Sequence, residues 1–401
     1  MGNDIFKLLT ESSSDAQKRA ANTFDILSDG AKQIILFGSG DLGRRTLKGA
    51  RELGVDIVCF CDNNEKIWGN EVDGLKILSP IDALNQYPKA VIVLTIWSAY
   101  VGHPLVEIQN QINAIRPCKV ISFLHFYWKY PSTFLPYWRC ELPHKTLEQF
   151  ELVGAAASLW SDEQSLNEYV GQVIWRITGD SSKLTTPVKD DQYFPEDIFG
   201  LVDDEVFIDI GAFDGDTLKV FQSKSKNQFK AYFAYEPDPF GCVKLQEYAN
   251  QLEDSLKSKI SIAPIGVGSH PEKIQIQTPG VYFKILYPEE TSAIAKTAVS
   301  EYASVDSMPL DITLKDAAPT YIKMDVEGFE PNIIFGARET IATHQPIVAI
   351  SIYHQFDHLW RLPLAVHAIF KDYNFYLRPH FHAGWELICY CVPKHRIKKQ
   401  N

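Results

Sequence analysis

Two motifs in the second half of the chain decide its fold: VFIDIGAFDGDT at Val206–Thr217 and YFAYEPD at Tyr232–Asp238. In the first, an apolar strand runs into a glycine-containing loop, and in the second, an apolar strand ends on an acid. The acids Asp209 and Glu236 are about one βαβ unit apart. Because the carboxyl ends of adjacent parallel strands meet at one edge of a sheet, this pattern predicts an α/β fold with a small-ligand site at that edge.

The residues of the loop narrow down the ligand. Three acids, Asp209, Asp214 and Asp216, repel a pyrophosphate but suit a ligand that is cationic or rich in hydroxyl and amino donors. Gly211 and Gly215 allow the backbone to turn sharply and to approach a ligand closely. The loop therefore predicts S-adenosylmethionine as the ligand in preference to a dinucleotide.

The acids around the loop have distinct expected partners. Glu236 ends its strand where an acid binds both hydroxyls of a ribose in nucleotide-binding folds. Asp238 either joins that contact or caps the following helix. Asp209 lies inside its strand and would be costly if buried without a partner, so we expect it to bond to loop amides or to the ligand amine.

A second group of charged residues follows further along the chain. The segment TYIKMDVEGFE places Lys323, Asp325, Glu327 and Glu330 at a strand end, and PIVAISIYHQFD ends a strand on His354. Acids packed this densely are costly unless they bind something or cap a helix. Asp325 is the first candidate for a proton acceptor and His354 the second, with Glu327 orienting a hydroxyl, although a structural role for His354 stays open. Carboxylates suit hard divalent cations, so a metal on these acids stays open, but no regular ligand spacing supports one and we name no metal ligands.

Seven apolar, strand-length segments run from about residue 202 onward: VFIDI, AYFAYE, KISIAPIGV, TYIKMDV, PIVAISIYH, NFYLRPHF and ELICYCV. Helical segments separate most of them, which is typical of a parallel sheet covered on both faces. The last two strands are joined tightly. We therefore predict a mostly parallel seven-stranded sheet whose final strand is reversed by a hairpin.

In this order, VFIDIGAFDGDT, YFAYEPD, VDS, YIKMDVEGFE, GARETI and ISIYH resemble the FkbM-type S-adenosylmethionine-dependent methyltransferases. The resemblance covers about residues 192–392 and includes the preceding QYF. The resemblance implies a class I methyltransferase-type sheet and O-methylation of a hydroxyl on a sugar or polyketide-like product. It implies that the methionine part of the cofactor is lined by Asp209, Gly211, Ala212, Asp214, Gly215 and Asp216. It also implies that Glu236 and Asp238 hold the ribose, that Gly266 and Val267 lie near the adenine, and that Asp325, Glu327 and His354 face the reacting methyl group.

The first half of the chain carries another nucleotide-like pattern. QIILFGSGDLGRRTL has a strand followed by G-x-G-x-x-G at Gly38, Gly40 and Gly43, which opens a helix, and Asp62 ends the next strand. The glycines suit a pyrophosphate at the helix terminus, and Asp62 suits a ribose diol. The pattern GSGDLG…FCDNN…G…LSP is also similar to amino-terminal modules of sugar-modifying enzymes. A nucleotide or nucleotide-sugar site, a purely structural module and an NAD redox domain all remain open.

These segments predict a chain of two Rossmann-like three-layer α/β units. The expected organisation is a nucleotide-binding-type module at 1–125, an aromatic-rich and helical linker region at 126–201, and a methyltransferase domain at 202–401. The linker begins with the aromatic run HFYWKYPSTFLPYW. Such a run is typical of a core or a domain interface, and the alternative is a platform for stacking sugar rings.

Composition limits the partners and the compartment. The chain has 401 residues and a formal net charge of −11, which disfavours nucleic acid as the main partner. No segment approaches the ~18 uninterrupted apolar residues of a membrane span, and MGNDIFKLLT lacks the features of a secretion signal. Most of the cysteines lie in apolar runs, as is typical of buried thiols. We therefore expect a cytoplasmic protein with a small-molecule or saccharide substrate, and the sequence predicts no oligomeric state.

Together, the motifs predict an S-adenosylmethionine-dependent O-methyltransferase (EC 2.1.1 class) that acts on a hydroxyl of a sugar or sugar-linked substrate. Two alternatives from other classes stay open. One is an NAD-dependent sugar-modifying oxidoreductase, and the other is a non-catalytic nucleotide-sensing binding protein.

Overall fold

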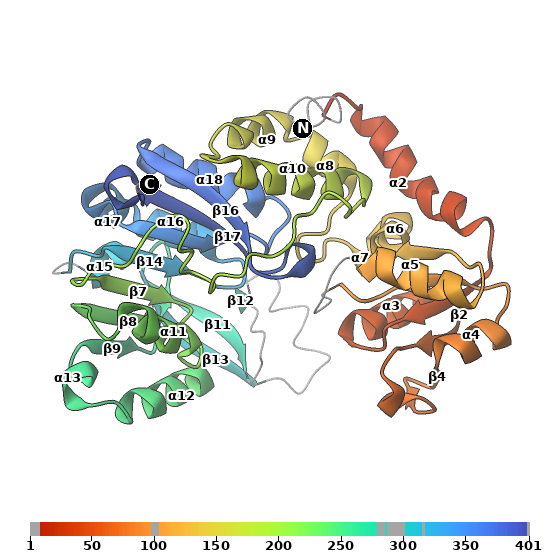
Figure 1. Ribbon diagram of the computed structural model, residues 1–401, viewed down its shortest axis with the longest axis horizontal. Helices are drawn as coiled ribbons and strands as arrows, with labels where there is room; N and C mark the ends of the chain where they lie inside the picture. Colours follow the sequence, from red (N-terminus) through yellow and green to blue (C-terminus); the bar gives the residue numbers. More distant parts are fainter. Residues whose placement is uncertain (1–8, 98–103, 279–284, 287–300, 315–316, 399–401) are drawn as a thin grey trace. The chain divides into compact units, whose positions relative to one another are not determined.

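The computed structural model describes residues 9–97, 104–278, 285–286, 301–314 and 317–398, which belong to two compact units (Figure 1). The first unit consists of Met1–Gly154, Asn167–Pro187 and Phe381–Trp385, and the second of Ala155–Leu166, Val188–His380 and Glu386–Asn401. The helices α9 (Phe150–Ala157) and α10 (Glu163–Thr178) contribute residues to both units. The region predicted as a linker, 126–201, is therefore divided between the two units.

The first unit is built on a six-stranded sheet with the order β3-β4-β2-β1-β5-β6, parallel except for the β3–β4 pair. Its strands are β1 (Gln33–Phe37), β2 (Asp56–Cys61), β3 (Glu71–Val72), β4 (Leu75–Leu78), β5 (Val91–Leu94) and β6 (Val120–Ser122). Along β1, Ile34 and Leu36 belong to one buried cluster, and Ile35 and Phe37 belong to another. Both faces of the sheet are thus covered, which explains why QIILF is apolar throughout.

Helices flank this sheet in the first unit. They are α2 (Ser13–Ser28), α3 (Asp41–Glu52), α4 (Pro80–Gln86), α5 (Pro104–Ile115), α6 (Phe123–Lys129), α7 (Pro131–Phe134) and α8 (Pro143–Leu147), with short 3₁₀ turns η1 (Glu65–Ile67) and η2 (His382–Gly384). The aromatic run that begins at His125 forms α6 and α7. Its side chains Phe126, Tyr127, Trp128 and Phe134 are buried in the core of this unit, so the run is core material.

The second unit contains a seven-stranded sheet with the order β16-β17-β15-β14-β7-β8-β9. Its strands are β7 (Val206–Ile210), β8 (Ala231–Tyr235), β9 (Ile260–Ala263), β14 (Tyr321–Met324), β15 (Ile347–Ser351), β16 (Tyr373–Pro379) and β17 (Leu387–Pro393). β17 lies between β15 and β16 and is antiparallel to both, while the other pairs are parallel. The predicted mostly parallel sheet with a reversed final strand is confirmed.

The helices of the second unit are α11 (Asp216–Ser225), α12 (Pro239–Asn250), α13 (Asp254–Lys257), α15 (Leu310–Thr313), α16 (Glu330–Gly336), α17 (Arg338–His344) and α18 (His358–Ile369), with a final 3₁₀ turn η3 (Lys394–Arg396). Residues Leu218 and Phe221 of α11 and Leu245 of α12 pack on one face of the sheet. α16, α17 and α18 contact one another, and α18 also contacts β17 (Figure 1).

One predicted strand was wrong in its extent. The segment KISIAPIGV forms two strands, β9 and β10 (Gly266–Val267), because Pro264 cannot donate a ladder hydrogen bond and interrupts the pairing. β10 belongs to a separate four-stranded sheet that was not predicted, with the order β10-β13-β11-β12. Its other strands are β11 (Glu272–Thr278), β12 (Ile285–Leu286) and β13 (Glu301–Met308).

Among the described residues, none of the helices has both the length and the apolar character needed to cross a bilayer. The segment MGNDIFKLLT was predicted to lack the features of a secretion signal. Its residues 1–8 lie outside the described residues.

Candidate active site

The loop after β7 is shaped by glycines where a side chain has no room. Gly211 has a φ of +80°, and a Cβ built on it would lie 2.0 Å from the carbonyl oxygen of Asp325. Gly215 has a φ of +86° and precedes α11 as its N-cap residue. Between them, Ala212 is buried and Asp214 is partly buried, whereas Asp216 is exposed and accepts a hydrogen bond from the Thr217 amide. The ends of β7 and β14 therefore approach each other closely only because residue 211 is a glycine.

A buried ion pair between Asp209 and Lys323 holds the loop after β7 in place. The Asp209 carboxylate lies 2.9 Å from the Lys323 ammonium and accepts a hydrogen bond from the Tyr232 hydroxyl. The same ammonium donates to the carbonyl oxygen of Gly211 at 2.6 Å. Burial lowers the pKa of Lys323, but the nearby carboxylates, Asp209 first among them, outweigh this effect and raise it. Asp209 thus has Lys323 and Tyr232 as partners, where we expected loop amides or a ligand amine.

Glu236 follows β8 and is fully buried. Its two carboxylate oxygens accept hydrogen bonds from the amides of Phe213 at 2.7 Å and of Asp238 at 2.8 Å. Burial raises the pKa of Glu236 to about 7, although these two hydrogen bonds oppose the rise. The neighbouring Asp238 accepts from the Gly241 amide at 3.1 Å and caps α12, which is one of its two expected roles.

Residues far apart in the sequence share a small cavity at the carboxyl ends of β7 and β8. Gly211, Gly266 and Val267 line it together with Val326 and Phe329, and its volume is about 20 Å³. That volume is enough for about one water molecule. The residues expected near the adenine therefore lie beside the glycine loop, and an adenine would enter there only if side chains such as Phe329 move.

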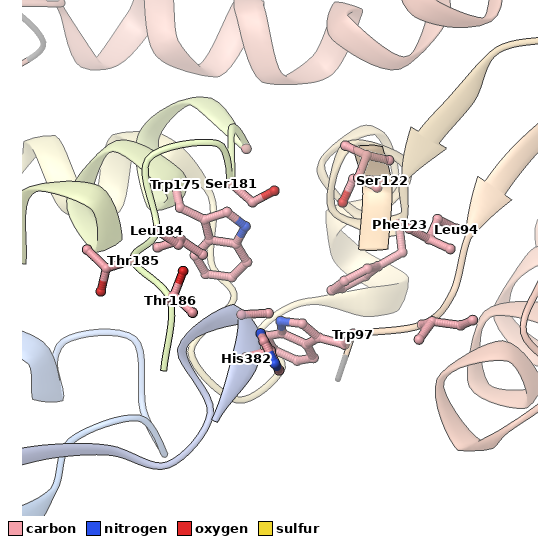
Figure 2. A pocket seen from close by; sticks show the side chains of 14 residues that line it. Leu94, Trp97, Ser122, Phe123, Trp175, Ser181, Leu184, Thr185, Thr186 and His382 are labelled. Carbon is pink, nitrogen blue, oxygen red and sulfur yellow. The ribbon is translucent and has the colours of Figure 1, made fainter. Parts of the chain in front are cut away.

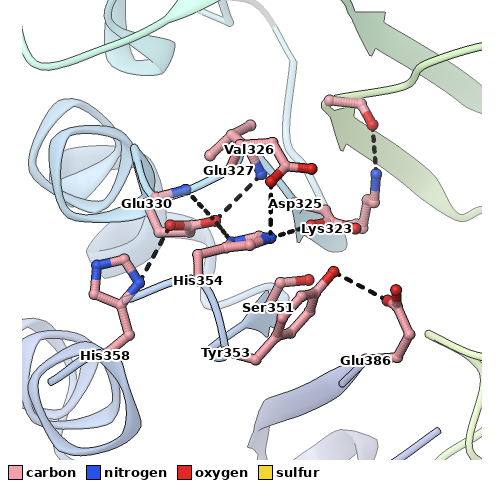
Figure 3. Close-up of polar contacts among 12 residues, drawn as sticks. Lys323, Asp325, Val326, Glu327, Glu330, Ser351, Tyr353, His354, His358 and Glu386 are labelled. Carbon is pink, nitrogen blue, oxygen red and sulfur yellow. Dashed lines mark hydrogen bonds and ion pairs between the residues drawn. The ribbon is translucent and has the colours of Figure 1, made fainter. Parts of the chain in front are cut away.

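The second predicted group forms a buried cluster around His354 (Figure 3). Its Nδ1 lies 2.7 Å from Glu330, and its Nε2 lies 3.4 Å from Asp325 and 3.7 Å from Glu327. On the other side of Glu330, the Nδ1 of His358 lies 3.4 Å from the second carboxylate oxygen. Three carboxylates, of Asp325 and Glu327 after β14 and of Glu330 at the start of α16, thus lie around one imidazole.

The charges within this cluster shift the pKa values of its members in different directions. Burial alone would lower the pKa of His354, but Glu330, Glu327 and Asp325 raise it to about 10. Burial likewise would raise the pKa of Glu330, but His354 and His358 lower it to about 2. For Glu327, burial is the largest cause and raises the pKa to about 7. His354 is therefore a cation near neutral pH, while Glu327 exchanges its proton in the neutral range.

The turn that carries Glu327 has an unusual backbone. Glu327 has a φ of +55°, and Gly328 follows it with a φ of +107°. A left-handed conformation at a residue with a long side chain costs about 1–3 kcal/mol and persists where the surroundings impose it. The turn holds the Glu327 carboxylate beside His354, and the side chain stays partly exposed.

Several polar residues of the site were not predicted as site residues. The Tyr193 hydroxyl donates to Asp325 at 2.7 Å, and the Gln192 side-chain amide donates to Glu386 at 2.6 Å. The Tyr353 hydroxyl donates to the same oxygen of Glu386 at 3.2 Å. The stretch QYF belongs to the region of the resemblance and was a signal for Tyr193, whereas Glu386 lies between β16 and β17, where no motif or spacing marks it.

The cluster also offers ligand atoms for a metal. Asp325, Glu330 and His354 each place one such atom within 4.8 Å of the others. A metal binds imidazole through a nitrogen lone pair, so the ligand must be neutral. Without a metal these acids raise the pKa of His354 to about 10, so binding of a metal at His354 would release its proton.

The glycine pattern of the first unit lies at the carboxyl end of β1. Gly38 has a φ of +107°, and a Cβ on Gly43 would lie 2.1 Å from the Gly38 carbonyl oxygen, so both glycines serve the close packing of α3 on β1. A Cβ on Gly40 would meet nothing within 4 Å. The carboxylate of Asp62 accepts from the amide and the hydroxyl of Ser39 at 3.3 and 3.2 Å. The structure thus brings the four predicted residues to one loop cluster.

Comparisons with known proteins bear on the second unit most directly. Residues 209–377 match the family model of the methyltransferase FkbM domain. A crystal structure of the methyltransferase FkbM from Methylobacillus flagellatus KT has a similar fold, with a TM-score of 0.75 and 19% sequence identity, over 95% of this chain and 99% of that chain. Among curated proteins, no match was found.

A weaker likeness exists to UDP-D-quinovosamine 4-dehydrogenase from Vibrio fischeri. It has a TM-score of 0.19 and 15% identity over 23% of this chain and 76% of that chain, and it carries no argument. The resemblance inferred from the motifs is confirmed: over residues 209–377 this chain matches the FkbM methyltransferase family, and family and fold together support a methyltransferase.

Proposed function

We propose that the second unit is an S-adenosylmethionine-dependent O-methyltransferase that acts on a hydroxyl of a sugar or sugar-linked substrate. One observation carries the proposal. The glycine loop, Glu236 and the pair Asp325 and Glu327 follow β7, β8 and β14, which are neighbours in the sheet, so all of them lie at one edge. Ligands of open α/β sheets bind at this edge.

The residues present fit this cofactor. When bound, S-adenosylmethionine supplies an electrophilic methyl group on a sulfonium. The loop residues Gly211, Ala212, Asp214, Gly215 and Asp216 would surround its methionine part, and Asp209 would hold that loop in place through Lys323. Glu236 would bind the ribose hydroxyls, with Asp238 nearby. Gly266 and Val267 would lie beside the adenine. The fit rests on the closeness of Gly211 to Asp325, on the buried carboxylate of Glu236, and on the cavity shared by Gly211, Gly266 and Val267.

For the proton, the cluster favours one carboxylate. A general base works best when its pKa lies near the working pH, and Glu327 has a pKa of about 7. We propose Glu327 as the acceptor of the substrate hydroxyl proton and Asp325, bound to Tyr193 and His354, as the group that orients the hydroxyl. With a pKa of about 10, His354 keeps its proton and holds the carboxylates in place as a cation.

Positioning contributes more to the rate than the base does. Alignment of two reactants can supply about 7–11 kcal/mol of a barrier. A general base supplies about 10²–10⁴-fold, which is roughly 3–5 kcal/mol. The network of Tyr193, Tyr353, Gln192 and Glu386 next to Asp325 offers several donors and acceptors, as a substrate with several hydroxyls requires.

The test of the cofactor site is calorimetric titration of the full chain with S-adenosylhomocysteine. We expect binding for the wild type and at least about tenfold weaker binding for Glu236→Gln, since a hydrogen bond to a charged group contributes about 1.5–3 kcal/mol. Glu247→Gln, on the exposed side of α12, removes the same charge and should leave the affinity unchanged. No binding by the wild type would refute the proposal, and undiminished binding by Glu236→Gln would refute the ribose assignment.

For the first unit, we propose that the loop of Gly38, Gly40 and Gly43 with Asp62 takes a nucleotide or nucleotide-sugar. The open space at Gly40 and the lack of a side-chain cap at the start of α3 favour this. Thermal shift with UDP-glucose, UDP and NAD tests it. A stabilisation by UDP-glucose that is lost in Asp62→Ala supports the site, and no shift with any of the three probes counts against it.

A further inference from the structure

A cavity in the first unit is lined by none of the residues of the sites described above. It has a volume of about 320 Å³, and it is found at the carboxyl ends of β5 and β6 (Figure 2). All the residues that line it belong to the first unit, and none falls within residues 209–377. Its volume is at the lower end of the range of small-molecule pockets, which suits a ligand of one or two rings better than a dinucleotide.

Aromatic rings form one wall of this cavity. Trp97 follows β5, Phe123 begins α6, and Trp175 comes from α10. The rings of Trp97 and Trp175 are stacked with centroids 6.1 Å apart, and the rings of Trp97 and Phe123 are 5.1 Å apart. Figure 2 shows Trp175 and Phe123 facing each other across the space, with Trp97 below them. Trp97 and Trp175 therefore form this wall, and Phe123 lies across the space from Trp175.

A buried cation behind the wall keeps the rings in place. The guanidinium of Arg139 lies 4.5 Å from the centre of the Trp97 ring and 5.5 Å from that of Trp175, and the side chain is fully buried. Arg139 does not line the cavity. A desolvated cation–π contact contributes about 2 kcal/mol or more, so the wall is held in one arrangement before any ligand arrives. Such pre-organisation reduces the entropy that binding would otherwise cost.

The polar groups of the cavity are hydroxyls. Ser122, Ser181, Thr185 and Thr186 line it along with His382. The Ser122 hydroxyl accepts from the Leu124 amide and so keeps its own proton for donation, while the Thr185 hydroxyl donates to Glu168 and keeps its lone pairs. No acid, lysine or arginine is found among the described residues that line the cavity. An anionic ligand group would thus have no lysine or arginine among these lining residues to bind directly, since the Arg139 guanidinium lies behind the rings and His382 offers an imidazole.

These features together define one class of ligand. We propose that this cavity of the first unit is a binding site for a neutral sugar ring. The C–H face of the ring would pack on Trp97 and Trp175, and its hydroxyls would bond to Ser122, Thr185 and Thr186. An apolar ring without hydroxyls would leave these polar groups unmatched, and a phosphate or carboxylate would find no lysine or arginine among the described lining residues. The proposal does not depend on methyl transfer, because the cavity shares no residue with the site at the edge of the seven-stranded sheet.

The test is saturation-transfer NMR on the full chain with methyl glucoside, methyl fucoside and N-acetylglucosamine, and with AMP and UDP as anionic ring compounds. We expect transfer from the protein to the ring protons of at least one neutral sugar. Thr186→Val keeps the shape of the side chain and removes one hydroxyl, so it should weaken binding about two- to tenfold. Trp175→Leu should weaken it about tenfold or more.

Two controls separate this site from others. Trp68→Leu removes a tryptophan that is 37% exposed and does not line the cavity, so sugar binding should stay unchanged. Thr343→Val, at an exposed position of α17 outside the cavity, removes a hydroxyl in the same way as Thr186→Val and should also leave sugar binding unchanged. The proposal is overturned if no neutral sugar binds, if sugar binding ignores both Thr186→Val and Trp175→Leu, or if AMP or UDP binds in a Trp175-dependent way while sugars do not.

Discussion

In both units the first strand of the main sheet is followed directly by a glycine with a positive φ, +107° at Gly38 and +80° at Gly211. At each glycine a Cβ would run into the end of the neighbouring strand, near Ile96 in the first unit and near Asp325 in the second. Two residues earlier the units differ. Leu36 is paired in register with Val93 in the first, whereas Asp209 is paired with Lys323 in the second.

The difference shows that similar backbone turns carry different side chains in the two units. In the second unit the buried ion pair continues into the acids and His354, and several pKa values there lie far from their usual ranges. In the first unit the edge leads to a cavity lined by aromatic rings and hydroxyls. The two edges thus share a glycine turn after the first strand and differ in the side chains that surround it.

The largest expected effect comes from breaking the ion pair. Lys323→Val leaves Asp209 buried with Tyr232 as its remaining partner and should cost about 3–5 kcal/mol of unfolding free energy. The double change Asp209→Leu with Lys323→Val reproduces the pair Leu36 and Val93 of the first unit. It should recover most of the loss, because apolar replacements of buried ion pairs are often neutral, apart from about 1–3 kcal/mol for the stranded Tyr232 hydroxyl.

Urea unfolding of the full chain measures both variants. Lys257→Val, at the exposed end of α13, is the matched control and should leave the unfolding midpoint unchanged. If the double variant were as unstable as Lys323→Val, the two edges would differ in more than this pair, and the comparison would fail.

The next effect concerns the rate of methyl transfer. Glu327→Gln should lower kcat about 10²–10⁴-fold while S-adenosylhomocysteine still binds, because the change removes a proton acceptor and keeps the shape of the side chain. In the wild type the rate should rise with pH through about 7, where Glu327 loses its proton, and this rise should vanish in the variant. Formation of S-adenosylhomocysteine with a panel of methyl glycosides as acceptors is the measurement.

Glu339→Gln is the control for charge, since Glu339 is exposed on α17. A wild-type kcat for Glu327→Gln would rule out Glu327 as the proton acceptor. Asp325, the first candidate from the sequence, would then be the next residue to test.

Two histidines should give the units opposite dependences on pH. The folded pKa of His354, about 10, lies above its ordinary value of 6.5, so its contribution to stability is complete below pH 6.5 and is lost as the pH rises through 10. Burial lowers the folded pKa of His125 in the first unit to about 4, so its contribution is complete above pH 6.5 and is lost as the pH falls through 4. Each can change the unfolding free energy by up to about 1.4 kcal/mol per pH unit.

Unfolding curves between pH 4 and 10 for His354→Gln and His125→Gln test this pair of slopes. The first variant should flatten the alkaline limb, and the second the acidic limb. His395→Gln, at an exposed position of η3, should alter neither. A His354→Gln protein that keeps the alkaline slope would show that His354 is not the cation of the second unit.

The sequence predicted the seven strands and the loop after β7 because both depend on local patterns, namely apolar runs and the placing of glycines. It did not predict the partner of Asp209, since Lys323 is brought to it by the register of β14 against β7. Glu386 reaches the site through the turn between β16 and β17, where no spacing rule applies. The cavity of the first unit was missed for the same reason, because Trp97, Trp175 and His382 come from three distant segments.

The smallest expected effect is that of removing divalent metals on S-adenosylhomocysteine binding and formation. It tests whether the charged cluster of the second unit needs an ion from solution. Asp325, Glu330 and His354 could hold a metal by geometry, since their ligand atoms lie within 4.8 Å of one another. With a pKa of about 10, however, His354 carries the proton that a metal would displace, and it supplies the positive charge itself. Treatment with EDTA should therefore leave S-adenosylhomocysteine binding and formation unchanged within about twofold, a difference below about 0.5 kcal/mol.

His354→Gln removes the internal cation, so added Mg²⁺ should raise the unfolding midpoint of this variant and not that of the wild type. A loss of wild-type activity in EDTA that Mg²⁺ restores would instead make His354 a metal ligand, and the charge of the second unit would then be balanced by an ion from solution.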